Sequence, residues 1–192
     1  DELLKAYQAH KDFIEAVYLA GDQCPEEPLD EILGEVSCPV RFILGNHEAD
    51  REYWLENHFG MWESHLHCRV HSARSLSVAG LSGVFKEKVW YPGEELEFST
   101  REEMYYYCLA RKNELYRNKL PRKHWTSIFP EDFNALAELK ADILLTHEAP
   151  TTQRYGFREI DELAEIMGVR LIVHGHHHES YHAVTSSGIK VI

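Results

Sequence analysis

Side chains that can bind a metal ion follow four apolar segments of this 192-residue chain, each after a glycine or threonine. The four groups are Gly21-Asp22, Gly45-Asn46-His47, Thr146-His147 and Gly175-His176-His177-His178. Carboxylate, amide oxygen and imidazole form a mixed oxygen and nitrogen ligand set, which suits Mn, Fe, Zn or Ni. A carboxylate such as Asp22 can bridge two ions, and two ions about 3.5–4 Å apart can polarise a phosphoryl group and activate water. The residue types therefore predict divalent-metal chemistry.

The elements that must position these groups are short apolar strands separated by helices. Strands are expected at 16–20, 40–44, 142–145 and 170–173, each ending just before one group. In open α/β sheets, ligands bind beyond the carboxyl ends of the strands, so the four groups are expected to converge. If 175–178 is extended, His176 and His178 point to the same side. Further strands are expected at 66–71 and 76–81, a hairpin at 181–192, and helices near 3–15, 29–36, 49–59, 102–116, 131–139 and 158–167.

Composition limits the class of protein. The net charge of −12 argues against a general coat for DNA or RNA, since neutralising phosphates needs surplus Lys and Arg. Apolar residues make up 44% of the chain, as in a folded domain, and no apolar run reaches the roughly 18 residues of a membrane span. The four scattered cysteines predict reduced thiols and a cytoplasmic location. The length predicts a single domain over 1–192 with no membrane partner.

One segment, about 85–130, lacks strand character and is rich in Tyr, Arg and Lys, so we expect it to be an insertion. Between 101 and 123, seven Lys and Arg residues stand against three Glu residues, with several tyrosines interleaved. Such a mixture can bind phosphates and stack bases. It can equally be an amphipathic helix with its aromatic side chains packed inward, or a surface for oligomer contacts. The sequence leaves these alternatives open.

The groups occur in the order typical of the calcineurin-like metallophosphoesterases, which the chain resembles over nearly its whole length. The most specific parts of the resemblance are Gly-Asn-His-Glu at 45–48 and Gly-His-x-His at 175–178. The resemblance implies an α/β/β/α sandwich with an inserted helical cap, two divalent metal ions and hydrolysis of a phosphate ester. It assigns metal binding to Asp22, Asn46, His147, His176 and His178, with Asp22 as the bridge and His178 at the second ion. It makes His47 the general acid or transition-state stabiliser and Glu48 the residue that orients it.

Within that superfamily, the segment 76–86 is similar to a strand-and-loop segment of the RNA lariat debranching enzymes. Gly21-Asp22-Gln23 also fits that subgroup better than the Gly-Asp-x-x-Asp pattern, which is absent. This narrower resemblance favours phosphodiesters over monoesters, with nucleotides and nucleic acids among the candidate substrates.

The chain departs from the family in one respect. The family's first motif, Asp-x-His on an initial strand, is not found, and we expect that strand to lie upstream of Asp1. A chain that lacked it naturally would favour a non-catalytic scaffold that keeps the fold for protein binding. A histidine-rich module that binds metal without catalysis is the third possibility. The remaining histidines, including His58, His65, His67, His71 and His124, are expected on the surface or in strands.

Overall fold

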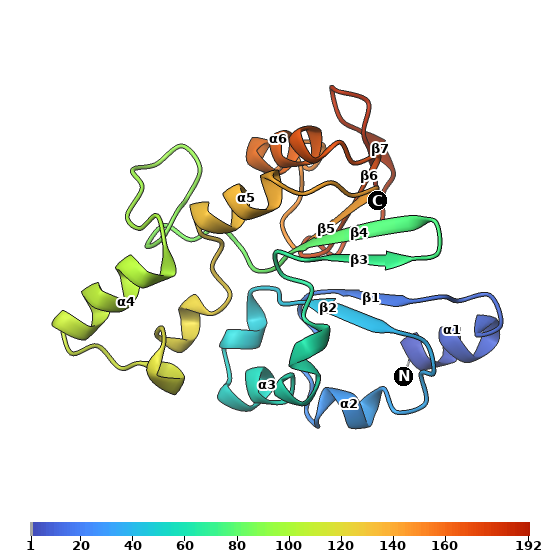
Figure 1. Cartoon of the computed structure of the whole chain (residues 1–192), viewed down its shortest axis with the longest axis horizontal. Helices are drawn as coiled ribbons and strands as arrows, with labels where there is room; N and C mark the ends of the chain where they lie inside the picture. The colour runs from blue at the N-terminus through green and yellow to red at the C-terminus, as the bar shows by residue number, and fades with distance from the viewer. Residues whose placement is uncertain (1) are drawn as a thin grey trace.

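The computed structural model describes residues 2–192, which form an α/β/β/α sandwich (Figure 1). The helices are α1 (Glu2–His10), α2 (Leu29–Ile32), α3 (Glu52–Glu56), α4 (Arg101–Ala110), α5 (Pro130–Ala137) and α6 (Arg158–Met167). Four 3-10 helices join them: η1 (His47–Ala49), η2 (Phe59–Ser64), η3 (Tyr116–Asn118) and η4 (Arg122–His124). The fold class expected from the sequence is confirmed.

Two sheets form the centre of the sandwich. The small one pairs β1 (Val17–Ala20) with β2 (Val40–Ile43) in parallel. The larger one has the order β3-β4-β5-β6-β8-β7, with parallel pairing from β4 through β8. Its strands are β3 (Val70–Ala73), β4 (Leu76–Leu81), β5 (Ile143–Thr146), β6 (Leu171–His174), β7 (Ala183–Val184) and β8 (Lys190–Val191). Helices α1 to α3 lie beside the small sheet, and α5 and α6 cover the outer face of the larger one (Figure 1).

Hydrophobic packing holds the layers together at three levels. Between the two sheets, Ile43 of β2 packs with Val78 of β4 and Leu145 of β5. A second cluster joins the small sheet to α1–α3, and a third joins the larger sheet to α5 and α6. Because burying each large apolar side chain contributes about 1.5–3 kcal/mol, these clusters fix the sheets against each other. The strand ends are therefore held at one edge.

Several expected elements differ in their bounds. The helices expected near 3–15, 29–36 and 102–116 end earlier, at His10, Ile32 and Ala110. The helix expected over 49–59 is split, because Arg51 has an extended backbone (φ −123°, ψ 139°) and α3 begins only after it. The strand expected over 66–71 begins at Val70 instead. His65 and His67 form isolated bridges to Phe42 and Gly80, so this stretch crosses between the two sheets rather than running along one.

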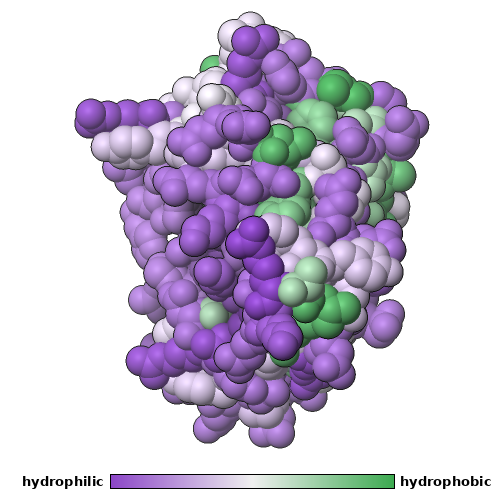
Figure 2. All heavy atoms as spheres, turned by 90° about the vertical axis from the view of Figure 1, so that its left-hand side faces the viewer, coloured by the Kyte–Doolittle hydropathy of each residue, from purple (hydrophilic) through white to green (hydrophobic). Residues whose placement is uncertain are grey.

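The segment 85–130 holds α4, η3 and η4, and none of its described residues belongs to a strand. It has a hydrophobic cluster of its own, made of Val89, Met104, Cys108, Leu120 and Phe129. The face at this end of the molecule is mainly hydrophilic, with hydrophobic residues in small separate patches (Figure 2). Within residues 2–192, no helix combines the length and apolarity that crossing a bilayer requires.

Candidate metal centre

Three strand ends meet at one point of the structure. Asp22 follows β1 of the small sheet, whereas His147 and His176 follow β5 and β6 of the larger sheet. A ligand atom of each of these residues lies within 4.8 Å of the others. The centre therefore forms where the edges of the two sheets meet.

A second contact set surrounds the ring of His147. Its Nε2 lies 3.2 Å from Oδ2 of Asp22 and 3.2 Å from Oδ1 of Asn46. Its Nδ1 donates to the carbonyl of Ala20 at 2.7 Å, and this hydrogen bond turns Nε2 toward the side-chain oxygens of Asp22 and Asn46. Such an outer hydrogen bond is the usual support of a histidine that binds a metal. Two oxygens and two imidazoles converge here, so the side chains fit a divalent transition-metal ion.

The ligand-bearing backbone is unusual at this edge. Asp22 (φ 56°), His176 (φ 71°) and His178 (φ 53°) all have left-handed conformations. An extended 175–178, the condition under which His176 and His178 would point to the same side, is therefore not found, since successive residues turn rather than alternate. His178 is exposed and is not one of the three converging donors, although it lines the same cleft of about 500 Å³. His178 and His176 are thus separated in role by the local backbone.

Glycine is required at two positions of the centre. A Cβ on Gly45 would overlap Oδ1 of Asp22 and the ring of His147. A Cβ on Gly21 (φ 95°) would overlap Nδ1 of His147, and its backbone conformation also favours glycine. The glycines before Asp22 and Asn46 therefore allow the ligand side chains to approach the strands closely.

Glu48 does not orient His47, so that expected role is wrong. The Glu48 carboxylate is fully buried and accepts from the amides of Gln23 and Gly45, both at 2.7 Å. Nδ1 of His47 lies 2.6 Å from Oδ2 of Asp50 instead. Asp50 was missed by the sequence analysis, although a position three residues further along a helical turn is within reach of a side chain. Glu48 fixes the loop, and Asp50 holds the imidazole.

Protonation states at the centre favour a cation. Burial alone would raise the pKa of Asp22, but hydrogen bonds from the His147 ring and the His47 amide lower it to about 2. Burial lowers the pKa of His176 to about 4. Burial would also lower the pKa of His147, but its contact with Asp22 raises it above the ordinary value. At neutral pH the chain therefore offers one carboxylate and one neutral imidazole without any change of protonation.

Other histidines behave differently from expectation. His58 and His124 are buried and lie outside the strands, which corrects their expected placement.

His67, Cys68 and Asp132 also bring ligand atoms close together. However, Nη2 of Arg101 donates to Oδ2 of Asp132 at 2.8 Å, and burial raises the pKa of the Cys68 thiol to about 12. The cluster of His67, Cys68 and Asp132 is therefore part of an ion-pair network, in which the Arg101 guanidinium takes the place that a metal ion would have.

Comparisons with known proteins identify relatives of this chain. The chain is 38% identical over 146 residues to an uncharacterized protein of Haemophilus influenzae, a match that covers 75% of this chain. The match covers 64% of that relative, so the chain spans slightly less than two thirds of its length. The crystal structure of TT1561 of Thermus thermophilus is similar at a TM-score of 0.57 and 19% identity, covering 98% of this chain and 80% of that one. A second solved structure has a TM-score of 0.50 and 14% identity, covering 98% of this chain and 82% of that one.

The two structural likenesses show the fold. The family model of the calcineurin-like phosphoesterases matches residues 1–180, which is nearly the whole chain. The chain belongs to the calcineurin-like phosphoesterase family.

Proposed function

We propose that this chain hydrolyses phosphate esters with two divalent ions at its metal centre, and that phosphodiesters are preferred. Metal-dependent phosphoester hydrolysis with two divalent ions is the general chemistry of the family. The observation that carries the proposal is the convergence of Asp22, His147 and His176, with Asn46 beside them. When bound, two such ions polarise a phosphoryl group and lower the pKa of water.

The chain's own residues would divide the remaining work. Asp22, Asn46, His147 and His176 would hold one ion, and Asp22 and His178 would supply ligands to the second. The His47 ring is half-exposed, and its hydrogen bond to Asp50 raises its pKa, so a larger fraction is protonated near neutral pH. With Nδ1 held by Asp50, Nε2–H is left to donate to a phosphoryl or leaving-group oxygen. Glu48 supports this by fixing the Gly45 and Gln23 amides.

Three finer parts of the proposal rest on different observations. The similarity of segment 76–86 to debranching enzymes supports a phosphodiester, with nucleotides or nucleic acids as candidate substrates. The mixed ligand set supports Mn, with Fe, Zn and Ni as alternatives. The four cysteines carry free thiols, which supports a reducing, cytoplasmic compartment.

The proposal is tested by assaying the full-length protein with Mn²⁺ on bis-p-nitrophenyl phosphate and p-nitrophenyl phosphate. We expect Asp22→Asn to abolish turnover, because it removes the anionic bridge. We expect His47→Ala to lower kcat roughly 100- to 10,000-fold, the usual range for a general acid. His10→Ala on α1 is the matched control and should leave turnover unchanged. Wild-type turnover no greater than that of Asp22→Asn contradicts hydrolysis, and a preference for the monoester contradicts the diester.

A metal-binding scaffold without turnover is the second candidate. It is supported by one observation, that the converging donors of the described residues suffice for one ion while His178 stands apart. If the scaffold hypothesis is correct, the wild type binds Mn²⁺ and Asp22→Asn binds it more weakly. The turnover of the wild type is then no greater than that of Asp22→Asn.

A further inference from the structure

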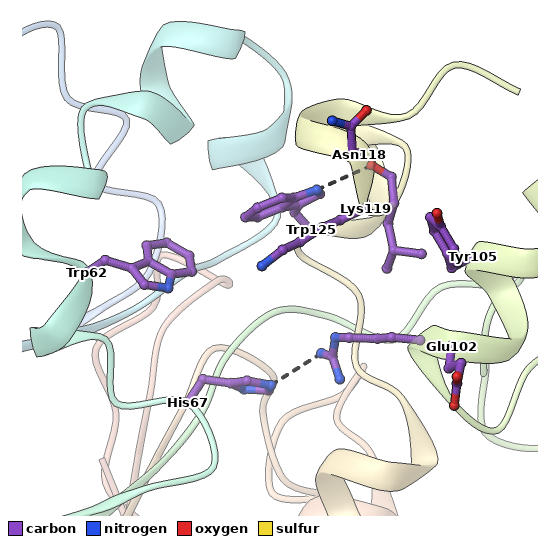
Figure 3. A pocket seen from close by; sticks show the side chains of 9 residues that line it. Trp62, His67, Glu102, Tyr105, Asn118, Lys119 and Trp125 are labelled. Carbon is purple, nitrogen blue, oxygen red and sulfur yellow. Dashed lines mark hydrogen bonds between the residues drawn. The ribbon is translucent and has the colours of Figure 1, made fainter. Parts of the chain in front are cut away.

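A second hollow, the aromatic pocket, lies away from the ligand side chains of the metal centre. It has a volume of about 440 Å³ and is lined mainly by Trp62, His67, Arg101, Tyr105, Lys119 and Trp125 (Figure 3). These residues come from η2, from the start of α4 and from the stretch around η3 and η4. Pockets of roughly 300–1,000 Å³ with aromatic walls are typical of small-molecule sites.

Two tryptophans form the walls. The rings of Trp62 and Trp125 stand edge to face, with centroids 6.1 Å apart and planes at 63°. Both side chains are only partly buried, and Tyr105 lies across the hollow. Stacking a planar ring on such a face contributes about 1–3 kcal/mol per base in known complexes. The walls therefore suit a flat aromatic ligand.

Two of the free polar groups that line the hollow are hydrogen-bond donors. The Nε1–H of Trp62 makes no hydrogen bond within residues 2–192, whereas that of Trp125 donates to the Leu120 carbonyl at 3.3 Å. The ammonium of Lys119 lies 5.6 Å from the Trp125 ring centroid and forms no ion pair within the described part of the chain. Figure 3 shows the Trp62 nitrogen and the Lys119 ammonium directed into the space beside the tryptophans.

The floor of the pocket carries little free charge. The guanidinium of Arg101 is paired with Asp132 and with Glu131, the latter at 3.0 Å. Nδ1 of His67 accepts from the Ser82 amide, and its Nε2 lies 3.1 Å from Oδ1 of Asp132 and 3.2 Å from Nη2 of Arg101. Because Arg101 is neutralised, the floor is a weak site for a phosphate. The exposed Glu102 carboxylate is directed away from the space between the tryptophans (Figure 3).

We propose that the aromatic pocket binds a planar heterocycle that carries ring carbonyl groups, of the uracil or guanine type. The ring stacks on Trp125, and its carbonyl oxygens accept from the edge-on Trp62 Nε1–H and the Lys119 ammonium. A ring that has an amino group in place of a carbonyl directs its own N–H donors at the donors of Trp62 and Lys119, and therefore binds more weakly.

The pocket is connected to the metal centre through η4. Trp125 directly follows η4, and Arg122 of η4 donates to the carbonyl of Asp50 at 3.3 Å. Asp50 in turn holds His47. Binding of the free heterocycle does not depend on the proposed hydrolysis.

The test uses the full chain with divalent ions removed by chelation, titrated with uridine and with cytidine. Uridine and cytidine differ chiefly by the exchange of a ring carbonyl for an amino group. We expect saturable quenching of tryptophan fluorescence by uridine, with an affinity at least roughly threefold above that for cytidine. Trp62→Phe keeps an aromatic wall but removes the N–H, and should weaken uridine roughly fivefold with little effect on cytidine.

Controls separate the pocket from other effects. Trp54→Phe removes a tryptophan outside the pocket, one that donates to Glu26, and should leave uridine binding unchanged. If Trp62→Phe fails to fold, Lys119→Met decides, because it removes the ammonium from an exposed side chain and should also weaken uridine. Equal affinity for the two nucleosides, no saturable binding by the wild type, or unchanged uridine binding in the deciding variant would overturn the proposal. Since no hydrolysis is measured, these outcomes are independent of the phosphoesterase assay.

Discussion

The residue next to His147 gives the metal-free chain a pH-dependent stability. Glu148 is 4% exposed, accepts the Phe85 amide at 2.9 Å, and burial raises its pKa to about 7. The folded state therefore holds this proton over a pH range in which the unfolded chain has lost it. The contribution to stability is full below about pH 4.5, falls as pH rises to about 7, and is lost above that value.

We expect Glu148→Gln to be more stable than the wild type above pH 7, because the amide keeps an acceptor for Phe85 without a buried charge. The gain is on the order of 3 kcal/mol, and it should vanish near pH 4.5. Urea unfolding of both chains in the presence of chelator at pH 4.5 and 8 measures it. Glu165→Gln on the exposed face of α6 is the control. A gain of the same size at both pH values would contradict the role of Glu148.

Sequence reasoning succeeded and failed at the centre for identifiable reasons. The convergence of Asp22, His147 and His176 was predictable, because the ends of apolar strands meet at a sheet edge. The role of Glu48 was not, because adjacency to His47 says nothing of where a side chain points after a tight turn. Its carboxylate turns inward to two backbone amides. The left-handed backbone at His176 and His178 could not be predicted either, since left-handed conformations depend on tertiary contacts.

Among the helices, the predictability depended on how clearly the ends are marked. The bounds of α6 agree with the predicted 158–167, because its apolar stripe is continuous and Gly168 (φ 73°) ends it in a left-handed cap. The split at Arg51 carries no comparable mark in the sequence. The tyrosines of α4, for which inward packing was one of the open alternatives, divide, since Tyr105 is half-buried while Tyr106 is 58% exposed.

Helix α4 supplies one wall of the aromatic pocket and depends on a cap at its start. Oγ1 of Thr100 accepts from the Glu103 amide at 3.1 Å, and the Glu103 carboxylate accepts from the Thr100 amide at 3.2 Å. We expect Thr100→Ala to lower the free energy of unfolding by about 1 kcal/mol, with Thr100→Ser close to wild type. Hydrogen exchange should show the loss at the first turn of α4. Unchanged protection there in Thr100→Ala would contradict the capping role.

For the whole molecule, metal binding should appear as added stability. An ion that binds only the folded state stabilises it by about 2.7 kcal/mol at a concentration 100 times its Kd. We therefore expect Mn²⁺ to raise the Tm of the wild type in calorimetry and chelator to reverse the rise. Asp22→Asn should lose most of this shift and the exposed His178→Ala less of it, because only Asp22 belongs to the converging donors. An equal shift in Asp22→Asn and wild type would place the ion elsewhere.

Ion pairs reduce the local charge of the segment 101–123, which is richer in Lys and Arg than the acidic chain as a whole. The basic residues of 101–123 face acidic neighbours in part, since Arg101, Arg117 and Arg122 pair with Glu131, Glu56 and Glu52. The predicted local surplus is therefore partly neutralised within the fold. This leaves recognition of an organic group, more than a broad phosphate-binding surface, as the role that the segment supports.

The left-handed backbone at Asp22 and His176 sets stability against the proposed binding of metal ions. Each such residue costs about 1–2 kcal/mol that glycine would avoid. Glycine at either position would relax the chain while deleting a ligand. A library of variants selected for heat resistance alone would be drawn toward glycine there and would lose the metal centre first, so directed evolution of this protein requires an activity screen in every round.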